Sequence, residues 1–173
     1  MSKLIWALIA IAMVVLGGGY GNRIRCLSDD GPQMAVLGYL SAMKNARFED
    51  AYRFVTASMT DGKPVAAWAA QQRKMYQLGA VKINELDVRK GHRNLKNMFT
   101  CAGSARVPNV LHASDLFNTQ GSTEFEVYSV IMEDGVWKID SQETLFDETA
   151  IKQWFPEDKM LATDDPGELP PAN

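Results

Sequence analysis

The sequence has little of the chemistry on which most enzymes and metalloproteins rely. It contains two histidines and two cysteines in 173 residues, and no Cys/His pair stands at the spacing of a zinc site. Two cysteines are too few for a disulfide scaffold. The net charge of −3 argues against a protein that binds nucleic acid by neutralising phosphates. We therefore expect no metal, no cofactor, no nucleic acid and no catalytic residue.

One long apolar run stands at the amino terminus. Residues 4–20 are all apolar or small, and 17 residues are near the minimum that spans a bilayer. Lys3 before the run and three glycines at its end also fit a cleaved signal peptide. Both alternatives stay open for residues 1–22, with a linker over 23–30. A retained segment predicts a single-pass membrane protein with its soluble head on the exported, periplasmic side.

Export bears on the two cysteines. An oxidising compartment would allow one bridge between Cys26 and Cys101. The alternative is two free thiols, with Cys101 buried in a strand.

Helical patterns fill the first half of the remaining chain. Acidic residues and Pro32 predict a helix start that leads to a helix over about 31–44. Apolar residues at helical spacing predict a short second helix after Asn45. Thr60, Asp61 and Pro64 open a third helix, which ends at Gly79. We expect one domain over 31–155, followed by an acidic, proline-containing tail over 156–173.

After Gly79 the period of the apolar residues changes to two, which is typical of strands. We expect a strand over 81–88 with a bulge near Asn84, a second over 98–107, and a hairpin over 122–142 that turns at residues 133–135. Residues 108–121 look like a loop. The fold class is then α+β, with three helices packed on a curved antiparallel sheet of about four strands.

This order of elements resembles the nuclear transport factor 2-like superfamily. The resemblance rests on "ARFEDAYRFVTASM" after the first helix and "GVWKIDSQ" at the end of the hairpin, and covers about residues 31–143. It implies a cone in which a curved sheet wraps the helices. Enzymes of this superfamily place an aspartate or histidine base and a tyrosine donor inside the cone, whereas many members only bind ligands or partners.

Alternation along the strands predicts which side chains enter the cone. The expected inward residues carry no carboxylate or imidazole; they are Phe99, Cys101, Phe125, Val127, Ser129, Ile131, Trp137 and Ile139. The expected outer face is also apolar, with Tyr128, Val130, Met132 and Val136. An apolar exposed face predicts a protein partner or a homodimer. The competing explanation is that the chain's own segment 148–155 covers it.

Two further groups are candidates for binding. Tyr52, Trp68, Phe99 and Trp137 could line a ligand pocket, although aromatic residues at such spacing are more often core. Arg89, Lys90, Arg93 and Lys96 gather around one turn. They could contact anionic lipid headgroups, and the alternative is a solvated hairpin.

Two functions follow from these patterns. The first is a noncatalytic, membrane-anchored accessory subunit whose soluble head docks a larger complex. The second is an exported binder of a small hydrophobic ligand, or an isomerase-like enzyme, with the same fold.

Overall fold

The computed structural model describes residues 21, 26, 28–97 and 101–158 of the chain. These residues form an α+β fold with four α-helices, one 3₁₀ turn and five strands. We expected three helices and about four strands. The structure contains in addition a C-terminal helix, α5, and a short strand, β2.

The helices begin and end close to the predicted residues. The N-terminal pair is α2 (Gly31–Lys44) and α3 (Phe48–Ala51), which continues into the 3₁₀ turn η1 (Tyr52–Phe54). Helix α4 (Val65–Gly79) follows Pro64 and ends where Ala80 takes a left-handed conformation, with φ of 49°. Helix α5 (Glu148–Trp154) is capped by the Asp147 side chain, which accepts the Ala150 N–H.

The five strands form one antiparallel sheet in which β3 and β4 are central. The strands are β1 (Lys82–Val88), β2 (His92–Leu95), β3 (Gly103–Ser114), β4 (Ser122–Glu133) and β5 (Val136–Leu145). The order is β1-β3-β4-β5, and β2 pairs with the other end of β3. The predicted bulge is confirmed, because the β1–β3 register shifts between Ile83 and Glu85.

Strand β3 differs from its prediction. It begins at Gly103 and runs through the stretch that we expected to be a loop, as far as Ser114. Leu111 packs on the helix side of the sheet and Val110 on the other side, so the alternation of a strand persists. Pro108 is tolerated because it lies between the stretches of β3 that pair with β1 and with β2, so its missing N–H interrupts neither ladder. Its carbonyl accepts the Arg89 N–H at 2.9 Å.

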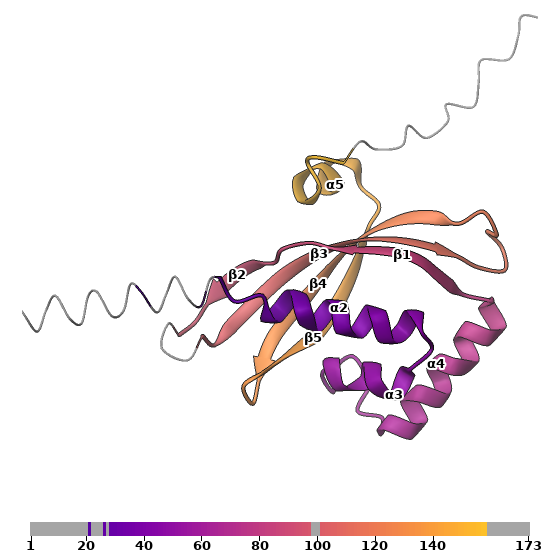
Figure 1. Ribbon diagram of the computed structural model, residues 1–173, viewed down its shortest axis with the longest axis horizontal. Coiled ribbons are helices and arrows are strands. Elements are labelled where there is room, and N and C mark those ends of the chain that lie inside the picture. The colour runs from indigo at the N-terminus through magenta and orange to yellow at the C-terminus, as the bar shows by residue number, and fades with distance from the viewer. Residues whose placement is uncertain (1–20, 22–25, 27, 98–100, 159–173) are drawn as a thin grey trace, which may run out of the picture.

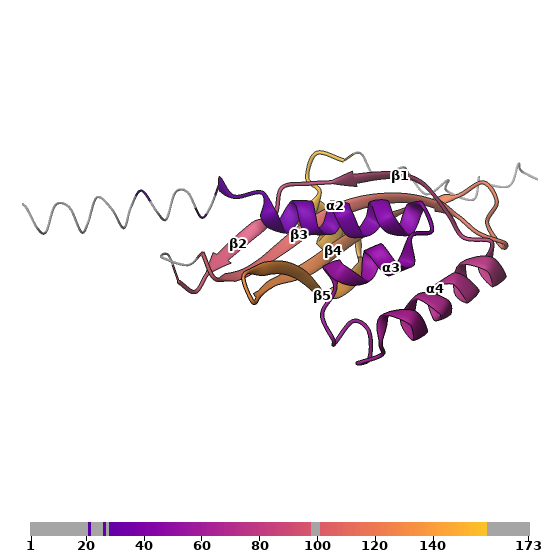
Figure 2. The same ribbon diagram turned by 60° about the horizontal axis from the view of Figure 1, so that its bottom comes forward.

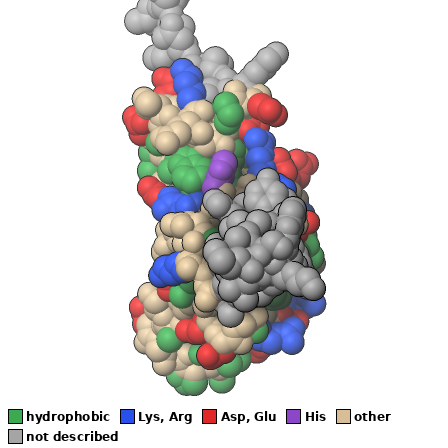
Figure 3. Space-filling view, turned by 90° about the vertical axis from the view of Figure 1, so that its left-hand side faces the viewer, with side chains coloured by type: hydrophobic (Ala, Val, Ile, Leu, Met, Phe, Trp, Pro, Cys, Tyr) green, Lys and Arg blue, Asp and Glu red, His purple; other side chains and the backbone are tan. Residues whose placement is uncertain are grey.

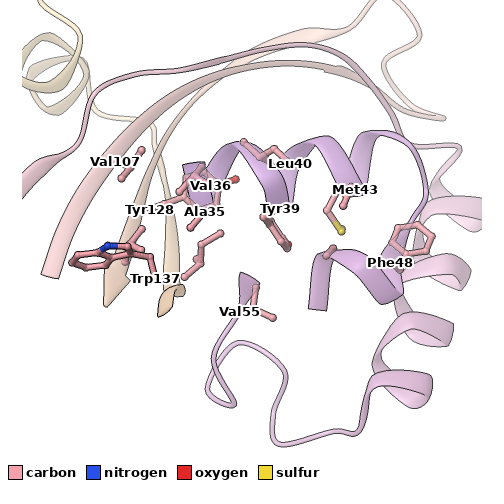
Figure 4. Close-up of a cluster of buried hydrophobic side chains, with 14 of the residues drawn as sticks. Ala35, Val36, Tyr39, Leu40, Met43, Phe48, Val55, Val107, Tyr128 and Trp137 are labelled. Carbon is pink, nitrogen blue, oxygen red and sulfur yellow. The ribbon is translucent and has the colours of Figure 1, made fainter. Parts of the chain in front are cut away.

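Two apolar layers hold the fold together, one on each side of the sheet. Helix α2 lies across the concave side, while α5 sits on the opposite side (Figures 1 and 2). The larger cluster of buried side chains lies between α2 and the sheet (Figure 4). The smaller cluster lies between α5 and the sheet.

The predicted terminal segments lie mostly outside the described residues. This applies to the apolar run over 4–20, to the rest of segment 1–22 except residue 21, and to the tail from residue 159 onward. Within the described part of the chain, no helix is long and apolar enough to cross a membrane.

Candidate functional site

The two faces of strand β4 are the reverse of those predicted. Tyr128 and Val130 are at most 1% exposed and pack with α2 in the larger cluster. Figure 4 shows Tyr128 beneath α2, near Val36. Met132 packs against the same cluster. The predicted position of Tyr128, Val130 and Met132 on the outer face was therefore wrong, and binding of a protein partner stays a prediction.

The length of the hairpin turn explains the error. We expected a turn of three residues, but Glu133 pairs with Val136, and only Asp134 and Gly135 lie between them. Both have positive φ, 51° and 79°, as in the type I′ turn favoured by hairpins. A shift of one residue moves every side chain of a strand to the other face. Val136 itself is 54% exposed.

The outer face of the sheet is covered by the chain itself. Val127 and Leu145 form the smaller cluster with Ile151 and Phe155, and the Phe155 ring lies 5.0 Å from the ring of Phe125. Segment 148–155 thus covers an apolar face of the sheet, but the residues beneath it are Phe125 and Val127 and not Tyr128 and Val130, which the competing explanation in the sequence analysis placed there.

The reversal also places a carboxylate on the helix side of the sheet. Glu126 is 2% exposed and precedes Tyr128 by two residues on the same face of β4. Its Oε2 accepts hydrogen bonds from Asn109 Nδ2 at 2.8 Å and from the Tyr128 hydroxyl at 2.9 Å. Its Oε1 accepts one from Gln142 Nε2 at 2.5 Å. All three partners are neutral side chains.

Burial dominates the electrostatics of this cluster. Desolvation raises the pKa of Glu126, against the opposing effect of its hydrogen bonds from Asn109 and Tyr128. Burial, and then the nearby Glu126 charge, raises the pKa of Tyr76 to about 12. The pKa of Tyr39 is raised by burial and by the charges of Tyr76 and Glu126. Glu126 thus holds a proton to higher pH than an ordinary glutamate.

One polar atom in the cluster has no partner. Asn109 is fully buried, and its Oδ1 accepts no hydrogen bond from the part of the chain that the structure describes. Such an atom costs free energy unless a ligand or water donates to it. The sequence analysis missed both Glu126 and Asn109, and recognition of Asp134 and Gly135 as a two-residue turn would have placed Glu126 on this face.

The predicted pocket aromatics do not come together at one site. Trp137 lines a groove of about 740 Å³ with Met34, Leu37, Phe54 and Val136. Tyr52 donates its hydroxyl to the Lys63 carbonyl at 2.8 Å and packs edge to face on Trp68. The two side chains therefore connect the loop before α4 to the helices on either side of it, and they do not line a pocket with Trp137. Phe99 lies outside the described residues.

The linker is fastened to the sheet beside this groove. Cys26 and Cys101 form a disulfide across 75 residues of sequence. The Arg93 guanidinium pairs with Asp29 at 3.2 Å and lies 4.5 Å from the centre of the Trp137 ring. A bridge of this kind is weakly consistent with an exported domain.

The basic turn is partly neutralised within the chain. Arg89 pairs with Asp87 and Asp158, and Arg93 is engaged as described above. Lys90 and Lys96 form no ion pair with the residues that the structure describes. Figure 3 shows this end of the molecule, where basic and acidic side chains are interspersed. Contact with anionic lipid stays a prediction. Among the residues that the structure describes, no group of three His, Cys, Asp or Glu side chains could hold a metal ion.

The domain is thus an α+β fold with helices on the concave side of an antiparallel sheet. No protein-family model matches the chain, and no curated protein matches it in sequence. It is similar to a cystatin-like domain of unknown function from Nostoc punctiforme (16% identity, 72% of this chain and 80% of that chain, TM-score 0.47). It is also similar to a ketosteroid isomerase-like protein from Erwinia carotovora (11% identity, 69% and 99%, TM-score 0.47).

A third similar structure is Bd1075 from Bdellovibrio bacteriovorus, with 12% identity and a TM-score of 0.44. The match covers 64% of this chain and only 38% of the length of Bd1075. All three are distant and concern the fold alone.

Proposed function

We propose that the domain is an exported ligand-binding member of the nuclear transport factor 2-like superfamily, and that its ligand lies on the concave side of the sheet next to Glu126. The observation that carries the proposal is a carboxyl group that is 2% exposed and has only neutral hydrogen-bond partners. A buried carboxylate without a cation costs several kcal/mol. Buried acids with perturbed pKa values are concentrated at functional sites.

The arrangement suggests how a ligand would bind. Of the three partners of Glu126, only Gln142 is exposed to solvent. A carbonyl or hydroxyl oxygen could take the place of the Gln142 amide, and a protonated Glu126 would donate to it. The surrounding core is apolar, which fits a small neutral molecule with an apolar body and one such oxygen.

The test compares Glu126→Met, which removes the donor while keeping a side chain of similar size, with Glu143→Met, a control on the same sheet at a carboxylate that is exposed and pairs with Arg106 at 2.8 Å. Each protein is purified undenatured from its native host, and its organic extract is analysed by mass spectrometry. We expect one small molecule per chain in the wild type and the control, and none in Glu126→Met. Equal recovery from Glu126→Met, or none from any protein, would overturn the proposal.

A second candidate is the noncatalytic accessory subunit tethered by its N-terminal segment. It is supported by the 740 Å³ groove, in which Met34 and Val136 are 58% and 54% exposed beside the start of α2. We would place there an apolar helix of a membrane partner, with an acidic residue facing Arg53. A photo-crosslinker at position 34 should then give one discrete adduct in host membranes, and one at the exposed Phe117 should give none.

A further inference from the structure

A second cavity, of about 410 Å³, lies where the ends of α2 and α4 meet the start of β1. Ligand pockets typically occupy about 300–1,000 Å³. The floor of the cavity is apolar and includes Met43, Phe48, Val81 and Ile83. Tyr76 forms part of the wall, and its hydroxyl is close enough to Glu126 for the two charges to interact.

The rim of this cavity carries charge of one sign. Lys44, Arg73 and Lys82 all line it, and none of the acidic side chains within the described ranges does. Arg73 pairs with Glu49 at 2.9 Å and stacks over the Phe48 ring. Glu49 therefore offsets one of the three charges and leaves a net positive rim.

The bulge in β1 orients one of these cations. The extra residue, Asn84, stands outside the β1–β3 pairing, and its carbonyl accepts a hydrogen bond from Lys44 Nζ at 2.5 Å. An ammonium has three donors, so two remain for a ligand. Lys82 lies two residues earlier on the same strand and is exposed. Bulges often re-aim side chains near functional sites.

We propose that this cavity binds a small amphiphilic anion, with its carboxylate or phosphate between Lys44 and Lys82 and its short apolar tail on the floor beside Phe48. The inference goes beyond the proposed function, because Glu126 does not line this cavity and the anion is a second ligand, distinct from the neutral molecule proposed there. Charge-assisted hydrogen bonds select the head group, and burial of the tail supplies the remaining affinity.

Calorimetric titration of the full chain with three probes tests the head and the tail separately. We expect sodium octanoate to bind, acetate to bind at least about tenfold more weakly, and octylammonium not to bind. Octanoate should shift the amide NMR signals of residues 43–48 and 73–83. Octylammonium binding as tightly as octanoate would overturn the proposal.

Three variants locate the site. Lys82→Gln should weaken octanoate binding about tenfold, whereas Lys74→Gln, on an exposed lysine of α4 outside the cavity, should leave it unchanged. Equal effects of the two lysine variants would overturn the cationic site. Glu126→Met separates the two proposals. If it keeps octanoate binding yet still loses the host-derived ligand, both stand, whereas retention of both ligands would refute only the role of Glu126.

Discussion

Replacement of Glu126 by glutamine should stabilise the domain at neutral pH. The glutamine carbonyl can accept from Asn109 and Tyr128 where Oε2 does now. Its amide nitrogen then faces Gln142, which is exposed and can rotate its own amide to present an oxygen. Glu126→Gln therefore removes a buried charge and keeps three hydrogen bonds.

The expected gain is about 1 to 2 kcal/mol at pH 7.5. Neutral replacements of buried charged groups are neutral or stabilising by about 1–4 kcal/mol. The lower part of that range applies because hydrogen bonds to a charged acceptor are stronger than neutral ones by about 1 kcal/mol.

The pH dependence follows from the direction of the pKa shift. The folded state raises the pKa of Glu126, so protonation favours folding. The stabilisation of wild type by this proton is complete below the unfolded-state pKa and is lost as the pH rises through the folded-state pKa. The advantage of Glu126→Gln should therefore be absent at acid pH and grow toward neutrality.

Urea denaturation at several pH values between 4.5 and 8 measures both effects. The control is Glu143→Gln, which loses one exposed ion pair and should change the free energy of unfolding by less than about 1 kcal/mol. The reasoning is refuted if wild type is the more stable protein at pH 7.5 and its lead widens as the pH rises. That result would mean that the hydrogen bonds outweigh desolvation and that the folded-state pKa is lowered.

Three other perturbations test the fold. Removal of the Cys26–Cys101 bridge with a reductant should lower the free energy of unfolding by about 4 kcal/mol, because the bridge closes a 75-residue separation; a thermal melt with and without reductant measures this. Phe155→Ala should cost about 3 kcal/mol and speed hydrogen exchange over 148–155, while Phe146→Ala, on a side chain that is 90% exposed, should cost almost nothing. Gly135→Ala should cost roughly 1 kcal/mol in urea denaturation through backbone strain alone, since its φ is 79° and nothing lies within 4 Å of the added Cβ.

Most of the elements could be predicted because their signals are local. Helix α2 begins after Asp30 and ends at Lys44, and α4 starts directly after Pro64, as proline and end-of-helix residues indicated. The bulge at Asn84 was visible as a change of phase between Ile83 and Leu86. The course of β3 beyond Val107 was not visible, because Pro108 and the polar residues after it also suit a loop.

The candidate site could not be predicted from alternation, because both faces of β4 are buried. On the helix side lie Glu126, Tyr128 and Val130, and on the side of α5 lies Val127. An antiparallel strand shows its orientation through a polar, solvated face. Here α5 removes that contrast, and the polar residue lies on the better buried side.

When both faces of a strand are buried, the turn decides which residues enter the core. Asp-Gly between alternating strands is among the strongest local signals of a two-residue hairpin loop, and it pairs Glu133 with Val136. That pairing puts Val130 opposite Ile139 and, beyond the bulge, Tyr128 opposite Gln142. Glu126 then has to lie under the helices, within reach of the same glutamine. A hairpin turn longer by one residue would turn the other side chains of β4 toward the helices. The interior would then be apolar and would contain no acid, so the length of this turn decides whether the domain has the site proposed at Glu126.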